Sequence, residues 1–345
     1  MSATAEVLTA TAAARAAVHP LIPVREGMLE SGPLALRHHG HLEQVRIAWR
    51  LTGPAQAPVV CALGGISAHR HVCLTAEAAC GWWHRIAGPG LPLDAAHFRI
   101  LSFDYLGGSG ESTGPAAGQG FPSISTDDQA QVLLRLLDHL GVASLHAIAG
   151  GSYGGMVALA FAAAHPERVE RLLVIGAADR AHPMATAWRS TQRSIVRFGI
   201  DSGEPARAMQ LARALAMTTY RSAEEFAARF DSPPGEAGGR FVFPVEEYLL
   251  SRGEDYAARY SPESFLCLSE SIDLHRVNAA RIFVPTTVVG FREDALVPLA
   301  DLRAMVARLP RGRLHELSSI FGHDAFLTEP DLLRSIFAGT LGRDL

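Results

Sequence analysis

The sequence predicts an α/β fold in which helices wrap a mostly parallel sheet, with a helical lid inserted late in the chain. Apolar runs of strand length alternate with helical patterns in the first half of the chain, and this alternation is typical of a parallel sheet. About a hundred residues, from 178 to 280, then show helical patterns without a buried strand. We therefore expect a core over 1–177, a lid over 178–280, and the rest of the core over 281–345.

The expected strands are short runs rich in buried-type residues. Before the lid they cover 45–51, 58–63, 98–103, 145–149 and 171–176, and after it 285–291 and 314–317. Nearly continuous apolar runs such as 58–63 indicate strands that are covered on both faces.

The expected helices of the core cover 126–140, 156–165 and 330–341. For the first, Thr126 or Asp127 is the expected N-cap and Gly141 the expected terminator. In the lid, Ser222 and Glu225 fit a capping box. Residues 231–240 hold two prolines and three glycines, and we expect a mobile connector there.

Composition argues against several classes of protein. The formal charge is −4, all 31 basic residues are arginine, and no basic stripe indicates nucleic acid or a membrane surface. No apolar run approaches the length that crosses a membrane. Residues 1–18 are alanine-rich and do not resemble a secretory signal. The four cysteines have no metal-ligand spacing, so we expect a reducing cytoplasm and a small-molecule substrate.

A histidine cluster near the N-terminus looks metal-like, but we assign no metal to it. His38 and His39, beside His41, are adjacent on an expected strand and would point to opposite faces.

The sequence Gly-Gly-Ser-Tyr-Gly at 150–154 follows an expected strand and precedes an expected helix. Glycines on both sides of Ser152 permit a turn sharp enough to expose its hydroxyl above the sheet. This pattern predicts a nucleophile elbow. The alternative is a glycine-rich turn whose serine only caps the helix.

A serine nucleophile needs a base and a carboxylate that orients the base. Asp294 follows the expected strand 285–291, and His323 lies between the last expected strand and the last helix. Each residue alone has a structural alternative, but the order Ser, Asp, His is that of the α/β-hydrolase fold. We therefore predict that Ser152, Asp294 and His323 form a catalytic triad.

The oxyanion hole of such a site combines two backbone N–H groups. One is that of Tyr153, the residue after the nucleophile, and the second comes from the loop after strand 58–63, from Leu63 or Gly64.

Three segments resemble the homoserine O-acyltransferase family. They are 150–159 around the nucleophile, 61–65 at the oxyanion strand and 322–327 around His323, and 188–195 is similar to the family's lid-entry helix. The resemblance implies that Arg193 holds the α-carboxylate of the amino-acid acceptor and that Asp324 binds its ammonium group. Without the family, both would be interpreted as surface charges.

The segment 64–72 departs from the acetyl-transferring members and resembles a compact branch associated with succinyl transfer. A succinyl group ends in a carboxylate, so Arg70, with His69 or His71, is a candidate clamp, and a solvated basic loop is the alternative. Trp82 and Trp83 either line the acyl channel or fill the core.

The resemblance implies an acyl-CoA-dependent homoserine O-acyltransferase of methionine biosynthesis, most simply an O-succinyltransferase, that works by a ping-pong acyl-serine mechanism. Its substrates would be L-homoserine and succinyl-CoA or acetyl-CoA, with acyl-CoA as co-substrate and no bound cofactor, and we expect a homodimer. The alternatives are homoserine O-acetyltransferase, serine O-acyltransferase, a serine hydrolase with the same triad, and a noncatalytic binding protein of the same fold.

Overall fold

An eight-stranded sheet forms the centre of the computed structural model, which describes residues 22–74 and 81–342. The interpretation of the first 18 residues therefore lies outside the described residues. The strand order is β1-β4-β8-β5-β9-β10-β13-β14. The strands are β1 (Val24–Ser31), β4 (Val45–Thr52), β8 (Arg99–Phe103), β5 (Val59–Leu63), β9 (Ala147–Gly151), β10 (Leu172–Ile175), β13 (Thr286–Phe291) and β14 (Gly312–Leu317).

The sheet is parallel from β8 to β14, and β4 near one edge runs antiparallel to both of its neighbours, β1 and β8. The α/β-hydrolase fold with a mostly parallel sheet is thus confirmed. Strand β1 is an addition to the prediction. Leu29 is the one buried residue among its eight, so β1 has no apolar run of the kind that marks the fully buried strands.

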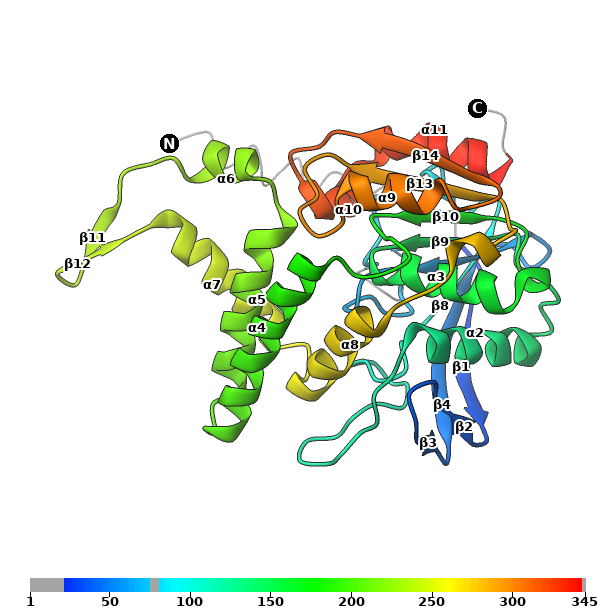
Figure 1. The fold of residues 1–345 in the computed structure, drawn as a ribbon, viewed down its shortest axis with the longest axis horizontal. Helices are drawn as coiled ribbons and strands as arrows, with labels where there is room; N and C mark the ends of the chain where they lie inside the picture. Colours follow the sequence, from blue (N-terminus) through cyan, green and yellow to red (C-terminus); the bar gives the residue numbers. More distant parts are fainter. Residues whose placement is uncertain (1–21, 75–80, 343–345) are drawn as a thin grey trace.

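Two apolar layers cover the faces of the sheet. One comes from α2 (Thr126–Leu140), α3 (Tyr153–Ala164) and α9 (Leu299–Val306), through residues such as Leu133, Val157 and Leu302. The other comes from α11 (Pro330–Leu341), through Phe337, and from Trp83 in the segment between β5 and β8. Figure 1 shows α2 and α3 on one side of the strands and α11 at the far end of the sheet.

Helix α2 shows how capping places an element. Its bounds and its end at Gly141, which is left-handed with φ 67°, are as predicted. The predicted cap is wrong, because Ser125 is the N-cap: its hydroxyl accepts from the N–H of Asp128, whose carboxylate accepts from the N–H of Ser125. This reciprocal pair satisfies two N–H groups, which a cap at Thr126 or Asp127 would not do.

The lid consists of five helices between β10 and the 3₁₀ turn η3 (Ala279–Arg281). They are α4 (Pro183–Asp201), α5 (Pro205–Tyr220), α6 (Ala223–Phe230), α7 (Pro244–Ala257) and α8 (Pro262–Leu274). Helix α5 packs between α4 and α7, and the group stands to one side of the sheet in Figure 1. The lid enters and leaves the core at one place. There the backbone N–H of Val277 donates to the carbonyl oxygen of Asp179, and the backbones of Arg180 and Arg276 form an isolated antiparallel β-bridge.

The predicted connector 231–240 is instead part of a small antiparallel hairpin. It is made of β11 (Gly235–Ala237) and β12 (Arg240–Val242), and the left-handed Gly238 and Gly239 form its turn. It extends away from the rest of the lid in Figure 1. Its strands are almost fully exposed, so no buried apolar run marks them in the sequence.

The remaining elements are short. They are β2 (Leu34–Ala35), β3 (His41–Leu42), β6 (Ala87–Gly88), β7 (Leu93–Asp94), η2 (Pro166–Arg168), η4 (Gly322–Asp324) and α10 (Ala325–Thr328). His38 and His39 lie in the turn between β2 and β3, with φ 81° at His39, so the strand expected there is wrong. Within the described part of the chain, no helix is long and apolar enough to cross a membrane.

Candidate active site

Ser152 sits at a strained turn between the end of β9 and the start of α3. It is one of two residues other than glycine with a positive φ in the described chain, with φ 53° and ψ −123°. Neighbouring glycines are required because a Cβ on Gly150 would lie 2.4 Å from the carbonyl oxygen of Gly154, and one on Gly151 would lie 2.5 Å from the ring of Phe326. The backbone therefore has the geometry of a nucleophile elbow, as predicted.

The oxyanion strand packs directly against the elbow. A Cβ on Gly154 would lie 2.3 Å from the carbonyl of Leu63, and Gly154 N–H donates to Gly64 O at 2.8 Å. Tyr105 holds the same carbonyl through its hydroxyl, also at 2.8 Å. The N–H of Tyr153 is at the first position of α3, where a helix offers no acceptor of its own. The two predicted donors, Tyr153 and Leu63, thus belong to segments in close contact.

Substitution of Gly154 by alanine is expected to lower both stability and activity, because the new methyl group would push the Leu63 segment away from the elbow. Overpacking of this kind costs about 1 to 3 kcal/mol. Chemical denaturation and acyl-transfer rates would measure the two effects. Gly339→Ala is the matched control: Gly339 lies in α11, its Cβ would meet nothing within 4 Å, and alanine there should stabilise the helix. Equal results for the two variants would contradict the assigned contact.

The three predicted triad residues are brought together. The His323 Nε2 atom lies 2.8 Å from Ser152 Oγ, and its Nδ1 atom lies 2.7 Å from Asp294 Oδ2. The second oxygen of Asp294 accepts from the N–H groups of Leu296 and Val297, at 2.8 and 3.0 Å. Asp294 and His323 are buried, and the carboxylate is held by these three nitrogen atoms, so it orients the imidazole.

Burial and the neighbouring carboxylate act in opposite directions on His323. Burial lowers its pKa, but the charge and hydrogen bond of Asp294 raise it more, so the net pKa lies above the usual 6.5. A general base must be neutral, so activity is lost as the pH falls through this raised value. We expect the acid limb of the rate of acyl-enzyme formation to have its midpoint above pH 6.5, measured by rapid quench across pH. A midpoint below 6.5 would contradict the interaction.

The triad opens into a cavity of about 240 Å³ between the core and the lid. The core lines it with Ser152, Tyr153, His323 and Asp324, and the lid lines it from α4, α5 and α8. Trp82 also lines it, whereas Trp83 stacks on Trp82 and is fully buried in the core, where its Nε1 donates to Phe326 O. Of the two roles that the sequence left open, Trp82 thus lines the cavity and Trp83 fills the core.

Asp324 lines the cavity beside His323, as the resemblance implies. Its Oδ2 atom accepts from Arg221 Nε at 2.9 Å. Arg193 differs from the expectation, because it does not line the cavity: its Nη1 donates to the carbonyl and hydroxyl oxygens of Ser269 and to Asp273. Its charge is thus already engaged below the cavity surface.

Arg189, one helical turn before Arg193, does line the cavity. Its Nε and Nη2 atoms donate to Asp273 Oδ1 at 2.9 and 2.6 Å. Burial raises the pKa of Asp273, but the two arginines and Thr186 lower it by a larger amount. The net pKa lies below its usual value, so this carboxylate stays ionised. Arg189 is therefore the arginine of α4 that faces the substrate space.

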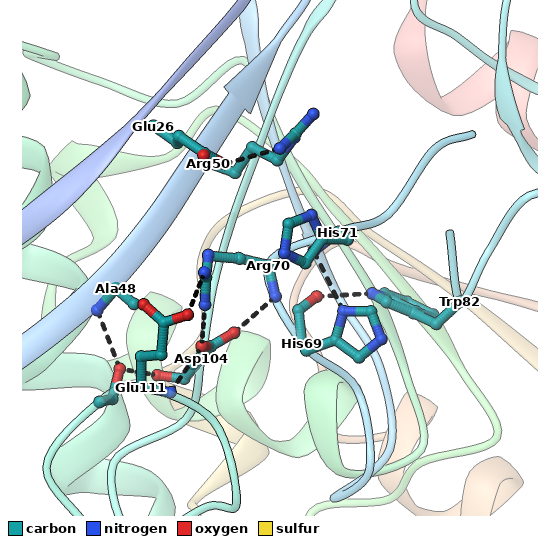
Figure 2. A network of polar contacts seen from close by, with 10 residues as sticks. Glu26, Ala48, Arg50, His69, Arg70, His71, Trp82, Asp104 and Glu111 are labelled. Atoms are coloured by element: carbon teal, nitrogen blue, oxygen red, sulfur yellow. Dashed lines mark hydrogen bonds and ion pairs between the residues drawn. The ribbon is translucent and has the colours of Figure 1, made fainter. Parts of the chain in front are cut away.

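Arg70 lies away from the cavity in which the predicted clamp would act. It is absent from the residues that line the cavity, and it forms ion pairs with Asp104 at 2.5 Å and Glu111 at 2.7 Å (Figure 2). Asp104 also accepts from the backbone N–H of Arg70, while His69 and His71 contact each other. With two carboxylates on one guanidinium, a third would not be attracted. These contacts favour the structural alternative for this loop over the predicted clamp.

The cavity residues that sequence reasoning missed include Arg189, Arg213 and Tyr220. Arg189 had a signal, because it lies four residues before Arg193 and so on the same helix face. No sequence signal marked Arg213 and Tyr220, which lie on α5. The side of a lid helix that is turned toward the cavity depends on how the helix packs in the folded protein.

The comparisons with known proteins agree with this geometry. A model of the alpha/beta hydrolase fold matches residues 58–330. A homoserine O-succinyltransferase of Xanthomonas campestris is 46% identical over 310 residues, which cover 89% of this chain and 82% of that protein. The chain belongs to the homoserine O-acyltransferase family. A second member, a homoserine O-acetyltransferase of Thermus thermophilus, is 38% identical over 278 residues, which cover 74% of this chain and 70% of that protein.

Solved structures share the fold of the family at lower identity. A homoserine O-acetyltransferase from Bacillus anthracis superposes with a TM-score of 0.83 at 19% identity and covers 93% of this chain and 98% of its own. Esterase E22 has the same TM-score and identity, and covers 92% of this chain and 100% of its own. Transferases and esterases thus share this fold, and the reaction must be argued from the site.

Proposed function

We propose that this protein is a homoserine O-succinyltransferase of methionine biosynthesis that uses succinyl-CoA as co-substrate and no bound cofactor. The observation that carries the proposal is the 46% identity to a homoserine O-succinyltransferase over 89% of the chain. The hydrogen-bonded Ser152, His323 and Asp294 at the floor of a cavity supply the chemistry that acyl transfer needs.

In the first half-reaction, His323 Nε2 takes the proton of Ser152 Oγ as this oxygen attacks the thioester carbonyl. The resulting oxyanion accepts hydrogen bonds from the backbone N–H groups of Tyr153 and Leu63. Collapse of the intermediate breaks the C–S bond, and the coenzyme A sulfur leaves with the proton that His323 holds. The product is an ester of Ser152 and a neutral His323.

In the second half-reaction, the homoserine hydroxyl attacks the acyl-serine while His323 takes its proton. The C–O bond to Ser152 breaks, and Ser152 Oγ recovers the proton from His323. A zwitterionic acceptor needs one anion and one cation near its reacting hydroxyl, and Asp324 and Arg189 supply this pair. An esterase has no use for such a pair, which favours transfer over hydrolysis.

An assay that crosses succinyl-CoA and acetyl-CoA with L-homoserine and L-serine tests the proposal. We expect the pair succinyl-CoA and homoserine to have the highest kcat/KM, and acyl-CoA to be consumed slowly without an acceptor. A preference for acetyl-CoA or serine would replace the proposal with homoserine O-acetyltransferase or serine O-acyltransferase. Equal consumption with and without acceptor would indicate a serine hydrolase.

Replacement of Asp324 by asparagine is expected to raise the KM for homoserine on the order of a hundredfold, because the acceptor ammonium loses a charge-assisted hydrogen bond. The rate of acyl-enzyme formation should change much less. Steady-state and rapid-quench kinetics give the two quantities. Asp331→Asn, at an exposed position of α11, is the control and should leave both unchanged. An unchanged KM in Asp324→Asn would remove this residue from the acceptor site.

We also propose a homodimer that forms through the lid, and a cytoplasmic location. Large apolar side chains of the lid face solvent: Phe198 is 73% exposed and Phe241 68%. Light scattering of the purified protein tests the dimer. The described thiols of Cys61, Cys73 and Cys267 are free, as is typical of a reducing compartment.

A further inference from the structure

Two buried tyrosines lie behind the segments that carry the predicted oxyanion donors. Tyr105 follows strand β8, and its hydroxyl donates to the carbonyl oxygen of Gly64 at 2.8 Å. The same carbonyl accepts from the N–H of Gly154 in the elbow. The ring of Tyr105 meets that of Tyr153 edge to face, with 5.0 Å between the ring centres and 80° between the planes. The two side chains therefore join the oxyanion strand to the elbow.

The hydroxyl of Tyr153 extends this connection into the lid. It lies 2.7 Å from Oγ of Ser271, which is fully buried on helix α8. Tyr153 thus has the predicted oxyanion donor, its backbone N–H, at one end and a hydrogen bond to the lid at the other. Removal of either hydroxyl would leave the other one buried without this partner, which makes the contact costly to break.

Helix α8 is also held from its other side. Two positions after Ser271, Asp273 accepts from Arg189 at 2.9 and 2.6 Å and from Arg193 at 2.7 Å, and both arginines belong to α4. A helix turns by about 100° per residue, so Ser271 and Asp273 lie on nearly opposite faces of α8. One face of α8 therefore contacts the elbow, while the other is fixed to α4 by ion pairs.

We propose that the side chain of Tyr153 is a positioning group for acyl transfer. Its hydroxyl, bonded to Ser271, holds the backbone N–H of Tyr153 at the place where the oxyanion forms. This inference rests on the proposed function, which supplies the oxyanion. A strained turn such as that of Ser152 keeps its geometry only where surrounding contacts fix it, and the bond to Ser271 is one such contact. Helix α8 must then be docked on the core before the oxyanion hole is complete.

The competing interpretation is that the two hydroxyls only pack the lid against the core. A packing contact contributes to the stability of the fold and leaves the reaction unchanged. A positioning contact also controls the hydrogen bonds that the acyl carbonyl oxygen accepts in the oxyanion hole. The stretching frequency of that carbonyl reports these hydrogen bonds, because stronger donors weaken the C=O bond and lower its frequency.

The experiment acylates Ser152 with succinyl-CoA that carries ¹³C at the thioester carbonyl, without acceptor, and records the infrared difference spectrum after rapid mixing. We expect Tyr153→Phe to move the ¹³C=O band of the acyl-enzyme to higher frequency. The acylation rate at saturating succinyl-CoA should fall about tenfold, with little change in the concentration that gives half the maximal rate. Ser271→Ala should have the same effects. The double variant should be no slower than the slower single variant, since both changes remove one contact.

Thr126→Val is the matched control, because it removes another buried hydrogen bond between the core and the same lid helix. The hydroxyl of Thr126, on α2, lies 2.7 Å from Nδ1 of His275, the C-cap of α8. We expect chemical denaturation to show a loss of stability in this variant comparable to that in Tyr153→Phe. The carbonyl band and the acylation rate should nevertheless remain those of the wild type.

A wild-type band and rate in both Tyr153→Phe and Ser271→Ala would overturn the inference while the proposed function stands. The same band shift in Thr126→Val would also overturn it, because the effect would then belong to docking of the lid in general. If Tyr153→Phe does not fold, Ser271→Ala decides by the same two measurements. A wild-type protein that forms no acyl-enzyme would refute the proposed function, and the inference with it.

Discussion

Replacement of Ser152 by alanine is expected to abolish acyl transfer and to leave no acyl-enzyme on mixing with acyl-CoA. The hydroxyl is the atom that His323 Nε2 faces at 2.8 Å, and no other group can form the covalent intermediate from that position. Loss of the nucleophile in such a triad lowers kcat by on the order of 10⁶-fold. Intact-mass spectrometry after mixing with succinyl-CoA measures the adduct directly.

The fold should survive this change. Ser152 occupies its strained backbone conformation because of the flanking glycines and the packing of Phe326, and a β-carbon is already present. Ser194→Ala, on an exposed position of α4, is the control for the loss of a serine hydroxyl and should acylate like the wild type. A full-stoichiometry adduct on Ser152→Ala would show that the nucleophile is another residue.

The second large effect is expected for Asp294→Asn, with a fall in kcat on the order of 10⁴-fold. An amide is nearly isosteric, so the hydrogen bonds from Leu296 and Val297 can be kept while the negative charge is lost. Without that charge, nothing favours the imidazolium form or the tautomer in which Nδ1 carries the proton.

The same variant should shift the pH profile. Burial lowers the pKa of His323, and Asp294 raises it; when the charge is removed, the effect of burial dominates. The acid limb of the residual activity should therefore move to lower pH than in the wild type. Asp201→Asn, exposed at the end of α4, should change neither rate nor profile. An unchanged limb in Asp294→Asn would mean that this carboxylate does not control the base.

Local patterns were sufficient to predict the parts of the site that local backbone geometry determines. Ser152 lies between glycines that a tight turn requires, and Asp294 follows a strand whose apolar run is visible in the sequence. His323 lies between the last strand and the last helix of the alternating pattern. Parallel strands end at one edge of a sheet, so residues far apart in the chain meet there. This is why the triad could be predicted without any view of its contacts.

The charged residues around the triad could not be predicted in the same way. Arg70 is neutralised by Asp104 and Glu111, and Arg193 is engaged by Asp273, which lies 80 positions later in the chain. A sequence shows that an arginine is present but not which carboxylate reaches it. Arg213 differs from these two arginines, because its guanidinium contacts the aromatic rings of Tyr220 and Tyr256 and not a carboxylate. This becomes visible only from the packing of α5 beside the cavity.

The joined ends of the lid have a consequence for how this enzyme family can change. Since Val277 N–H and Asp179 O close the junction, the five helices form a cassette attached to the core at one place. Insertions whose ends meet are exchangeable with little disturbance of their host. The nucleophile, base and carboxylate all belong to the host, whereas Arg189 and Arg213 belong to the cassette. Exchange of the five lid helices between relatives could therefore transfer substrate preference without changing the catalytic triad.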